Sequence, residues 1–577
     1  MPSATIADLL VDTLEAAGVA RIYGVAGDSL NAITESIRRR DTIDWVHVRH
    51  EEVAAFAAGA EAHLTGGLAV CAGSCGPGNL HLINGLFDAM RSRVPVVAIA
   101  AQIPSAEIGR SYFQETDPTR LFRDCSVYCE LVSSPKQLPG VFESAVRAAI
   151  GERGVAVIVL PGDVALESAA GLPKLSAALV PARPVTAPNP AEIADLATML
   201  DASTRITLLC GRGCWGAHDR VVALADRLKA PIVHALGGKE GIEWDNPFDV
   251  GMTGLIGFSS GYHAMKETEL LLMLGTDFPY RQFYPTEARI AQIDLRPAHL
   301  GRRTPIDLGI TADVAASIDA LLELVAPKPD RAWLDLCLEH YADARQGLDE
   351  LAAGTNSKPP IHPQHLARLL SEHASDDAVF TFDVGTPTVW AARYLRMNGR
   401  RRLIGSLNHG SMANALAQAI GAQAAYPQRQ IIAFCGDGGF SMLMGDLLTL
   451  KQHRLPVKVV ILDNHTLGFV EMEMKAAGFL DTAVALTDTD YAAMARGAGI
   501  QGWRVTEPAD LEPTLTTFLA HPGPAVLDVV TARQELALPP KFEAEQIKGF
   551  SLYLARAVLD GRGSSVIDLA RTNLRRR

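Results

Sequence analysis

The sequence predicts an α/β protein of three doubly wound parallel-sheet domains followed by a C-terminal helical tail. Two observations carry this prediction. Short β-branched runs alternate with amphipathic helical patterns through most of the 577 residues, which is typical of parallel sheets covered by helices. Residues 172–192 and 351–364 lack periodicity, are rich in Pro and small residues, and are predicted to be linkers. They divide the chain into three α/β blocks and a tail.

The first block is predicted to be a domain covering residues 1–175. Its pattern IADLLVDTLEAAG has helical periodicity and ends at Gly18. Strand-like runs follow in RIYGVAG, DWVHVRH and LAVCAG, with the helical patterns DSLNAITESIRRR and EEVAAFAAGAEAHLTG between them. The apolar runs VPVVAIAAQ and VAVIVLPG complete the alternation, so a parallel sheet is expected here.

The second block, residues 186–328, and the third block, residues 360–531, repeat this alternation. The second contains Gly-x-Gly-x-x-Gly after the strand-like run ITLLC, which alone favours a nicotinamide dinucleotide site. That fingerprint also needs an acid about 20 residues further on, at the end of the next strand. The next strand-like run, PIVHALGGK, ends in glycines, so a nicotinamide site is rejected.

Composition narrows the class of protein. The net charge of −12 gives no support for nucleic-acid binding. No apolar run approaches the ~18 residues that a membrane span needs, and the N-terminus lacks the pattern of a secretory signal, so a cytoplasmic protein is expected. None of the eight cysteines forms a Cys-x-x-Cys pair, and buried thiols in a reducing compartment are expected.

The third block carries the most informative motif. The segment QIIAFCGDGG predicts a strand, a tight glycine turn and a helix, an arrangement that lets a backbone approach a phosphate. Asp437 lies in that turn, and Asn464 ends the next apolar run, VKVVILDN. Since ligands of doubly wound sheets lie at the carboxyl ends of strands, these two residues are expected to hold a diphosphate-bound Mg2+. The alternative is that Asp437 is a helix cap and Asn464 a turn residue.

The GDG turn and the asparagine at this separation resemble the diphosphate motif of thiamine diphosphate (ThDP) enzymes. The resemblance implies ThDP and Mg2+ as cofactors, with the Thr466 carbonyl as a further metal ligand, and Met412 as the apolar residue that bends ThDP. Met412 in ordinary core packing is the alternative. The family usually has two asparagines where this chain has Asp463 and Asn464. The residues expected to bind ThDP are Gly385, Thr386, Gly410, Ser411, Met412, Asp437, Gly438, Gly439, Asn464, Thr466, Leu467 and Gly468.

The first block extends the resemblance. Glu51 opens the predicted helix EEVAAFAAGAEAHLTG, and the resemblance implies that its carboxyl contacts the aminopyrimidine of ThDP and promotes loss of the thiazolium C2 proton. The alternative for Glu51 is a first-turn acid favoured by the helix dipole. SCGPGN at 74–79 resembles a glycine turn of the active site. By resemblance, Phe113 and Gln114 line the substrate pocket and Phe469 moves into it.

The second block resembles the FAD-binding domain of pyruvate oxidases and acetolactate synthases. In ThDP enzymes without flavin the same block is a spacer, which is the alternative. Asp294, at a predicted strand end, is expected to hold the adenosine ribose. The other residues that the resemblance assigns to FAD are Met252, Thr253, Gly254, Leu255, Gly275, Thr276, Asp277 and Phe278.

The tail, residues 532–577, contains two amphipathic patterns. One places Phe550, Leu554, Ala557 and Val558 on a single face, and the other groups Val566, Leu569, Ala570 and Leu574. Residues 556–577 hold six arginines and two aspartates. An apolar stripe with a basic end is typical of a helix lying on an anionic membrane, and the alternative is a helix docked on the protein's own body.

Nearly the whole chain is similar to the FAD-containing, quinone-reducing pyruvate dehydrogenases of bacterial membranes. The resemblance implies oxidative decarboxylation of pyruvate to acetate and CO2 through hydroxyethyl-ThDP, with electrons passed through FAD to ubiquinone. It also implies a homotetramer on the inner face of the membrane, anchored on anionic lipid by the tail, with active sites between subunits. Three alternatives stay open: an acetolactate-synthase-type carboligase with structural FAD, an O2-dependent pyruvate oxidase, and a non-catalytic relative.

Overall fold

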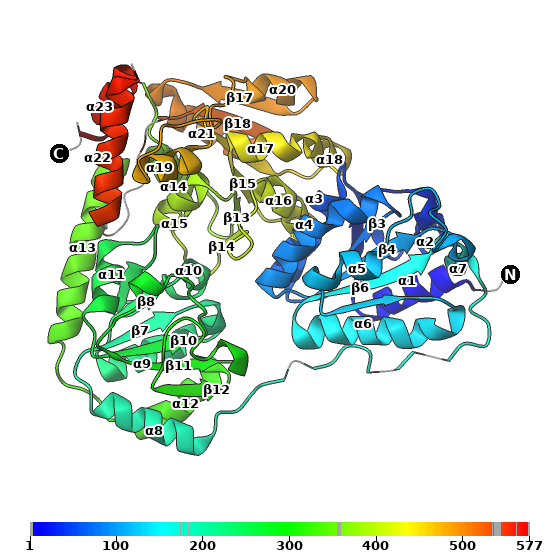
Figure 1. Cartoon of the computed structure of the whole chain (residues 1–577), viewed down its shortest axis with the longest axis horizontal. Helices are drawn as coiled ribbons and strands as arrows, with labels where there is room; N and C mark the ends of the chain where they lie inside the picture. Colours follow the sequence, from blue (N-terminus) through cyan, green and yellow to red (C-terminus); the bar gives the residue numbers. More distant parts are fainter. Residues whose placement is uncertain are drawn as a thin grey trace.

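The computed structural model describes residues 4–173, 175–176, 178–182, 184–354, 359–533, 535, 544–560 and 562–574. Parts of both predicted linkers, residues 174, 177, 183 and 355–358, lie outside this set, as do 536–543 and the basic end at 575–577. The described chain forms three six-stranded sheets, each flanked by helices (Figure 1), and all their strand pairs are parallel. The predicted class of three doubly wound α/β domains is therefore confirmed, while the limits of the domains stay predictions.

The first sheet has the strand order β2-β1-β3-β4-β6-β5. Its central strands are buried along their whole length because helices cover both faces. The strands are β1 (Arg21–Gly24), β2 (Asp44–His47), β3 (Ala69–Gly73), β4 (Val96–Gln102), β5 (Tyr128–Leu131) and β6 (Val155–Pro161). The helices are α1 (Ile6–Ala16), α2 (Asn31–Arg40), α3 (Glu51–Thr65), α4 (Pro77–Ser92), α5 (Pro118–Leu121), α6 (Leu138–Glu152) and α7 (Gly162–Leu166).

The second sheet has the order β12-β11-β10-β7-β8-β9. Its strands are β7 (Ile206–Cys210), β8 (Ile232–His234), β9 (Asp249–Met252), β10 (Leu270–Leu274), β11 (Arg289–Asp294) and β12 (Leu308–Thr311). The helices are α8 (Pro190–Asp201), α9 (His218–Leu228), α10 (Leu236–Ile242), α11 (Ser259–Lys266) and α12 (Val314–Leu324). The long helix α13 (Ala332–Ala352) then runs from this domain toward the third (Figure 1).

The third sheet has the order β14-β13-β15-β16-β18-β17. Its strands are β13 (Val379–Phe382), β14 (Arg402–Gly405), β15 (Ile431–Gly436), β16 (Lys458–Asp463), β17 (Gln501–Val505) and β18 (Ala525–Val530). The helices are α14 (Pro363–His373), α15 (Thr386–Tyr394), α16 (Asn414–Ala425), α17 (Asp437–Leu443), α18 (Leu447–Gln452), α19 (Gly468–Ala476), α20 (Tyr491–Gly497) and α21 (Pro508–Ala520). The predicted strand, glycine turn and helix around Asp437 correspond to β15 and α17.

Helix α3 joins the first and third domains. It packs along α4 on one side and along α16 of the third domain on the other. Both α3 and α16 are rich in Ala and Gly, and the carbonyl of Ala57 lies so close to Gly421 that a Cβ there would collide with it. These small side chains let the helices approach closely, and one apolar cluster runs through both domains.

Two tail helices, α22 (Ala544–Leu559) and α23 (Gly563–Leu574), follow the third domain, and α22 packs against α19. Tyr553, Ala557 and Leu569 form a small buried cluster with Phe550, Leu554 and Val566 packed against it. The predicted stripe is therefore largely turned toward the protein, but Val558 is 60% exposed. Among the described residues, no helix combines the length and hydropathy needed to cross a membrane.

Candidate active site

The carboxyl edge of the third sheet brings the predicted metal loops together. Gly436 at the end of β15 pairs with Leu462 of β16. The residues that follow this pair in the chain, Asp437 just after β15 and Asp463 at the end of β16, therefore lie beside each other at this edge. Asp437 is also the first residue of α17, whose N-terminal N–H groups point toward the same edge. The sequence placed Asp437 at a strand tip, and the structure has it there.

Glycines at this edge let the loops approach each other. A Cβ at Gly438 would lie 2.6 Å from the Leu467 side chain and 3.3 Å from Met412 Cε, and a Cβ at Gly439 would collide with the Asp383 carboxylate. Three of the predicted cofactor loops thus converge on the start of α17. Because Gly438 and Gly439 have no side chains, the main-chain N–H groups at the start of α17 stay accessible to a phosphate.

Asp437 is a buried carboxyl with one unsatisfied oxygen at this edge. Its side chain is 3% exposed, its Oδ1 accepts the Gly438 N–H at 2.8 Å, and its Oδ2 has no hydrogen-bond partner. Burial raises the pKa of Asp437 to about 7, and the neighbouring Asp463 adds to the rise. A buried carboxylate of this kind is stabilised by a proton or by a cation, so the edge fits a metal ion that carries a diphosphate.

Asn464 starts a turn that ends at Gly468. The Asn464 Oδ1 accepts a hydrogen bond from the Thr466 N–H at 3.2 Å. A Cβ added at Gly468 would lie only 2.8 Å from the Asn464 Nδ2, so this position has room only for glycine. The Thr466 carbonyl accepts the Gly468 N–H at 2.8 Å, which leaves its second lone pair for another partner. Asn464, Gly468 and Thr386 line one small pocket, so two of the predicted loops meet at this turn.

Several residues at this edge were not predicted. Asp463 and His465 lie with Asp437 in one group whose ligand atoms are all within 4.8 Å of one another. Glu471, on the first turn of α19, accepts the Thr466 hydroxyl at 2.6 Å and pairs with the buried Lys475 at 2.6 Å. The signal that could have found this pair is the four-residue spacing of Glu471 and Lys475 on one helix.

Glu51 is the first residue of α3 and is buried. Its Oε2 lies 2.8 Å from His81 Nδ1. A Cβ at Gly78 would lie 3.0 Å from Glu51 Oε1, so the predicted glycine turn at 74–79 packs on this carboxyl. His50 caps the helix by accepting the Glu52 N–H at 3.3 Å, which fixes the direction in which Glu51 leaves the helix.

The predicted pocket residues occupy three different settings. The Gln114 Oε1 accepts a hydrogen bond from the Cys75 thiol at 3.4 Å. Gln114 has a φ of +61°, and this contact holds its loop against the glycine turn at 74–79. Phe113 is 78% exposed in the single chain. Phe469 is half-buried in α19 and packs against the core of the third domain.

The middle domain brings its predicted FAD residues to the ends of neighbouring strands. Gly275 follows β10 with a φ of +55°, and the Gly-x-Gly turn packs on it so closely that a Cβ at Gly213 would lie 2.5 Å from its Cα. Thr253, after β9, is buried with an unpartnered hydroxyl. An orphaned hydroxyl beside closely packed glycine turns at strand ends fits a bound dinucleotide.

The two acids of this region already have partners. Asp294 Oδ1 lies 3.1 Å from His299 Nδ1 and accepts the Arg296 N–H at 2.9 Å. Asp277 forms ion pairs with Arg302 at 3.1 Å and with Arg303 at 2.8 Å. The arginines give this strand edge a positive rim, which suits the phosphates of a dinucleotide. Met252 and Phe278 are buried beside it, with Gly254, Leu255 and Thr276 in the same loops.

The three domains match three family models. The thiamine pyrophosphate enzyme N-terminal TPP binding domain matches residues 4–121, the central domain matches residues 193–321, and the C-terminal TPP binding domain matches residues 383–529.

Three relatives cover nearly the whole chain. A putative thiamine pyrophosphate-containing protein of Bacillus subtilis, YdaP, is 38% identical over 96% of both chains. A pyruvate oxidase of Lactiplantibacillus plantarum is 29% identical over 96% of both chains. The acetolactate synthase large subunit of Parasynechococcus marenigrum is 31% identical over 92% of this chain and 88% of its own.

Proposed function

Because this chain belongs to the family of thiamine pyrophosphate enzymes, we propose that it oxidatively decarboxylates pyruvate to acetate and CO2, with electrons passed through FAD to ubiquinone. The observation that carries the proposal is the strand edge of the third domain, where the buried Asp437 keeps an unpartnered oxygen beside the glycines at 438 and 439. Similarity to a pyruvate oxidase along 96% of both chains supports the choice of substrate and reaction.

The residues of the third domain hold the diphosphate end of the cofactor in this proposal. When bound, ThDP supplies the carbon nucleophile and the electron sink for decarboxylation. Asp437, the Asn464 side chain and the Thr466 carbonyl ligate Mg2+, a hard cation that prefers such oxygens. The start of α17 offers N–H groups to the diphosphate, and Met412 supports the cofactor's apolar side from beside Gly438.

Glu51 moves the proton that activates ThDP. A buried carboxyl held 2.8 Å from His81 has a fixed direction and is shielded from water, which suits exchange of a proton with a base positioned against it. We propose a homotetramer in which ThDP lies between subunits and Glu51 faces Asp437 of the partner subunit. Phe113, Gln114 and Phe469 then surround pyruvate.

FAD is proposed to bind along the middle domain. It supplies the two-electron acceptor that separates an oxidase from a simple decarboxylase. The unpartnered hydroxyl of Thr253 offers a hydrogen bond to the cofactor, the loop at Gly254 has the positive φ that favours glycine, and Asp294 lies at the end of β11 where a ribose binds in such sheets.

The tail is proposed to bring the enzyme to the inner face of the cell membrane. The exposed apolar side chains on its two helices include Leu559 and Ile567, the same segment of the sequence is rich in arginine, and apolar and basic groups together bind anionic lipid. Binding would place reduced FAD near a membrane quinone. Sedimentation with anionic and with neutral vesicles tests this part, since equal recovery with both would contradict it.

The proposed reaction is tested with the purified protein, ThDP, Mg2+, FAD and pyruvate under anaerobic conditions. The expected result is bleaching of the flavin absorbance, release of CO2 and acetate, and recovery of the colour when a quinone analogue is added. A flavin that stays oxidised while acetolactate accumulates would instead establish the second candidate, a carboligase, which the similarity to an acetolactate synthase favours.

A further inference from the structure

The strand that leads to Glu51 lies at an edge of the first sheet. β2 is the outermost strand of that sheet, beside β1. The Val48 N–H points inward and donates to the Gly24 carbonyl of β1 at 3.2 Å. Since successive N–H groups of a strand point to opposite sides, those of His47 and Arg49 face away from the sheet and need acceptors from elsewhere.

The third domain of the same chain supplies these acceptors. Asp446, just before α18, accepts the Arg49 N–H at 2.9 Å, and His453, just after α18, accepts the His47 N–H at 3.0 Å through Nε2. The Thr449 hydroxyl lies 3.3 Å from the His47 carbonyl oxygen and 2.8 Å from Asp446 Oδ1. Burial lowers the pKa of His453, which keeps its ring neutral and able to accept. Asp446, Thr449 and His453 together are called the edge clasp below.

The edge clasp ends two residues before Glu51. His50, the residue between, caps α3, and its ring stacks on His81 with the ring centroids 4.2 Å apart. His81 in turn lies 2.8 Å from the Glu51 carboxyl. Because the hydrogen bonds at residues 47 and 49 fix the backbone that enters α3, they also fix the direction in which the Glu51 side chain leaves the helix.

We propose that Asp446 and His453 are positioning residues that hold Glu51 in the direction required to move the proton of ThDP. They act through the backbone at residues 47 and 49, so the third domain of each chain sets the geometry of a group in the first. This role rests on the proton step proposed for Glu51. A clasp that only covered the edge of β2 against unwanted pairing would leave that step unchanged, and this difference can be measured.

The test uses the full-length protein and the variants Asp446→Ala and His453→Leu, which each remove one acceptor. Without cofactors, amide hydrogen exchange followed by mass spectrometry should become about 10-fold faster in residues 44–52. With ThDP and Mg2+ but no pyruvate, exchange of the thiazolium C2 proton for deuterium, followed by nuclear magnetic resonance, should slow about 10- to 100-fold. The affinity for ThDP should stay unchanged.

Two conservative variants and one control sharpen the test. Asp446→Asn and His453→Gln keep an acceptor oxygen at each position and should restore most of both exchange rates. The matched control is Lys451→Ala on the same helix, because Lys451 donates to the Ala498 carbonyl at 2.8 Å instead of the edge of β2, and it should change neither rate. Circular dichroism melting verifies folding, and the half-buried His453 gives a decisive variant even if Asp446→Ala does not fold.

Faster amide exchange with an unchanged rate at C2 would show that the edge clasp only covers the strand, and it would overturn the proposal. Unchanged amide exchange in folded variants would overturn it too. A protein inactive with pyruvate would still give both readouts, because neither uses pyruvate. If the original protein exchanged the C2 proton no faster than free ThDP does, the proton step proposed for Glu51 would fail, and the positioning role would fail with it.

Discussion

Buried carboxyls at strand ends and helix starts define the chemistry at the residue scale. Asp437, Asp463 and Glu51 are all withdrawn from water, yet their surroundings differ. The two aspartates share one strand edge, and their pKa values are raised by burial, whereas Glu51 has an imidazole 2.8 Å away. The first pair suits a cation and the second arrangement suits proton movement.

The role of Glu51 leads to a first prediction. Replacing Glu51 with Gln keeps its shape but removes the ionisable group, so pyruvate-dependent flavin bleaching should slow by about 100- to 10,000-fold. The matched control is Glu52→Gln, because Glu52 is adjacent but bonds Asn84 at 2.7 Å, and it should stay within a few-fold of the original rate. Similar rates for the two variants would remove Glu51 from the proton step.

A second prediction concerns Asp249, at the start of β9. Burial raises the pKa of Asp249 to about 8, far above the ~3.9 of an unfolded Asp. Between about pH 4 and pH 8 the folded state therefore holds one more proton than the unfolded state, so stability falls as the pH rises, by at most about 1.4 kcal/mol per unit.

The measurement is thermal melting of the original protein and of Asp249→Asn between pH 5.5 and pH 9. The amide carries no proton to lose, so its melting temperature should vary less with pH up to about pH 8, and the two curves should run parallel above that value. Identical slopes below pH 8 would show that Asp249 is already ionised in the folded protein.

The sequence could predict where Asp437 and Asn464 lie but not what surrounds them. Both follow apolar runs, and the carboxyl ends of parallel strands meet at one edge. The approach of Asp463 and His465 to Asp437 depends on the left-handed backbone at His465, which no pattern in VKVVILDNHT indicates. The predicted contacts with ThDP, Mg2+ and FAD stay predictions.

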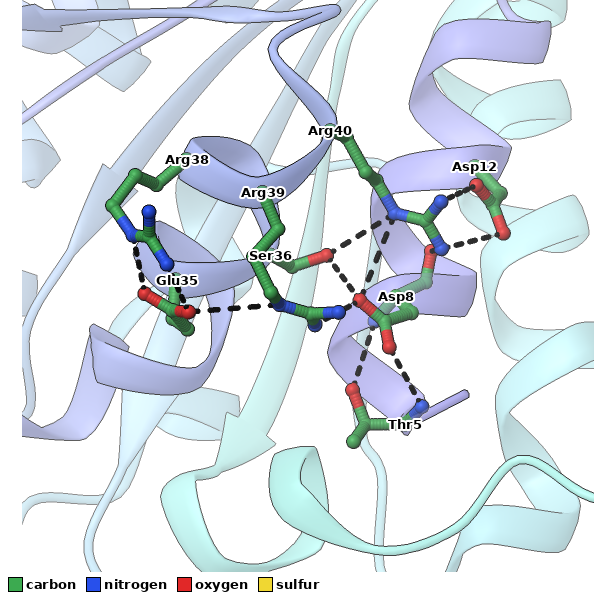
Figure 2. A network of polar contacts seen from close by, with 8 residues as sticks. All are labelled: Thr5, Asp8, Asp12, Glu35, Ser36, Arg38, Arg39 and Arg40. Atoms are coloured by element: carbon green, nitrogen blue, oxygen red, sulfur yellow. Dashed lines mark hydrogen bonds and ion pairs between the residues drawn. The ribbon is translucent and has the colours of Figure 1, made fainter. Parts of the chain in front are cut away.

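At the scale of elements, helices α1 and α2 are joined by a polar clamp (Figure 2). Asp8 is buried; it completes a capping box with Thr5 and accepts the Ser36 hydroxyl and the Arg39 guanidinium, each at 2.6 Å. Burial opposes its ionisation, but the hydrogen bonds from Ser36 and Thr5 and the charge of Arg39 outweigh it, so the pKa of Asp8 is lowered.

The clamp gives a third prediction. Asp8→Ala leaves Ser36 and the cap of α1 without their acceptor and should lower the free energy of unfolding by about 1–3 kcal/mol. The control Glu35→Ala removes a half-exposed carboxylate that pairs with the exposed Arg38 and Arg39 in the same network. It should lower stability much less than Asp8→Ala does, because exposed ion pairs contribute little. Chemical denaturation measures the free energy of unfolding of both variants. If Asp8→Ala and Glu35→Ala had equal denaturation midpoints, the clamp would add no stability.

The sheets were predictable element by element, because their buried strands are short β-branched runs between helical patterns. Helix α13 was not predicted. Of its residues only Trp333, Leu334, Cys337 and Ala352 are buried, so a long solvated helix leaves little periodic signal in the sequence. The buried face of α22 was predicted except for Val558, which is exposed.

At the scale of the whole molecule, the tail is docked on the third domain. Tyr553 is buried beneath Lys475, whose Nζ lies 5.4 Å from its ring, and Arg556 donates to the Gly478 carbonyl at 2.6 Å. The sequence left docking and lipid binding as alternatives because an amphipathic stripe serves both. The structure shows the docked arrangement, and lipid binding stays a proposal.

Docking gives a fourth prediction. Tyr553→Ala removes the largest buried side chain of the tail, a loss of about 3–5 kcal/mol for a large aromatic, so α22 should detach. Limited trypsin digestion should then cut after Arg556 or Arg562 much faster than in the original protein, as mass spectrometry of the fragments would reveal. The control is Leu559→Ala, whose side chain is 87% exposed, and it should not change the rate of tryptic cleavage. If Tyr553→Ala were cleaved as slowly as the original protein, docking of the tail through this ring would be contradicted.

The close packing of α3 on α16 has a consequence for biosynthesis. Residues 66–413 lie between these helices and must be translated before α16 leaves the ribosome. At roughly 5–20 residues per second, synthesis of these residues takes on the order of 20–70 s. During this time the alanine-rich surface of α3 has no α16 to pack against. A nascent chain stalled before residue 414 would therefore expose the apolar surface of α3 that α16 normally covers. Such truncated products are expected to bind chaperones or to precipitate.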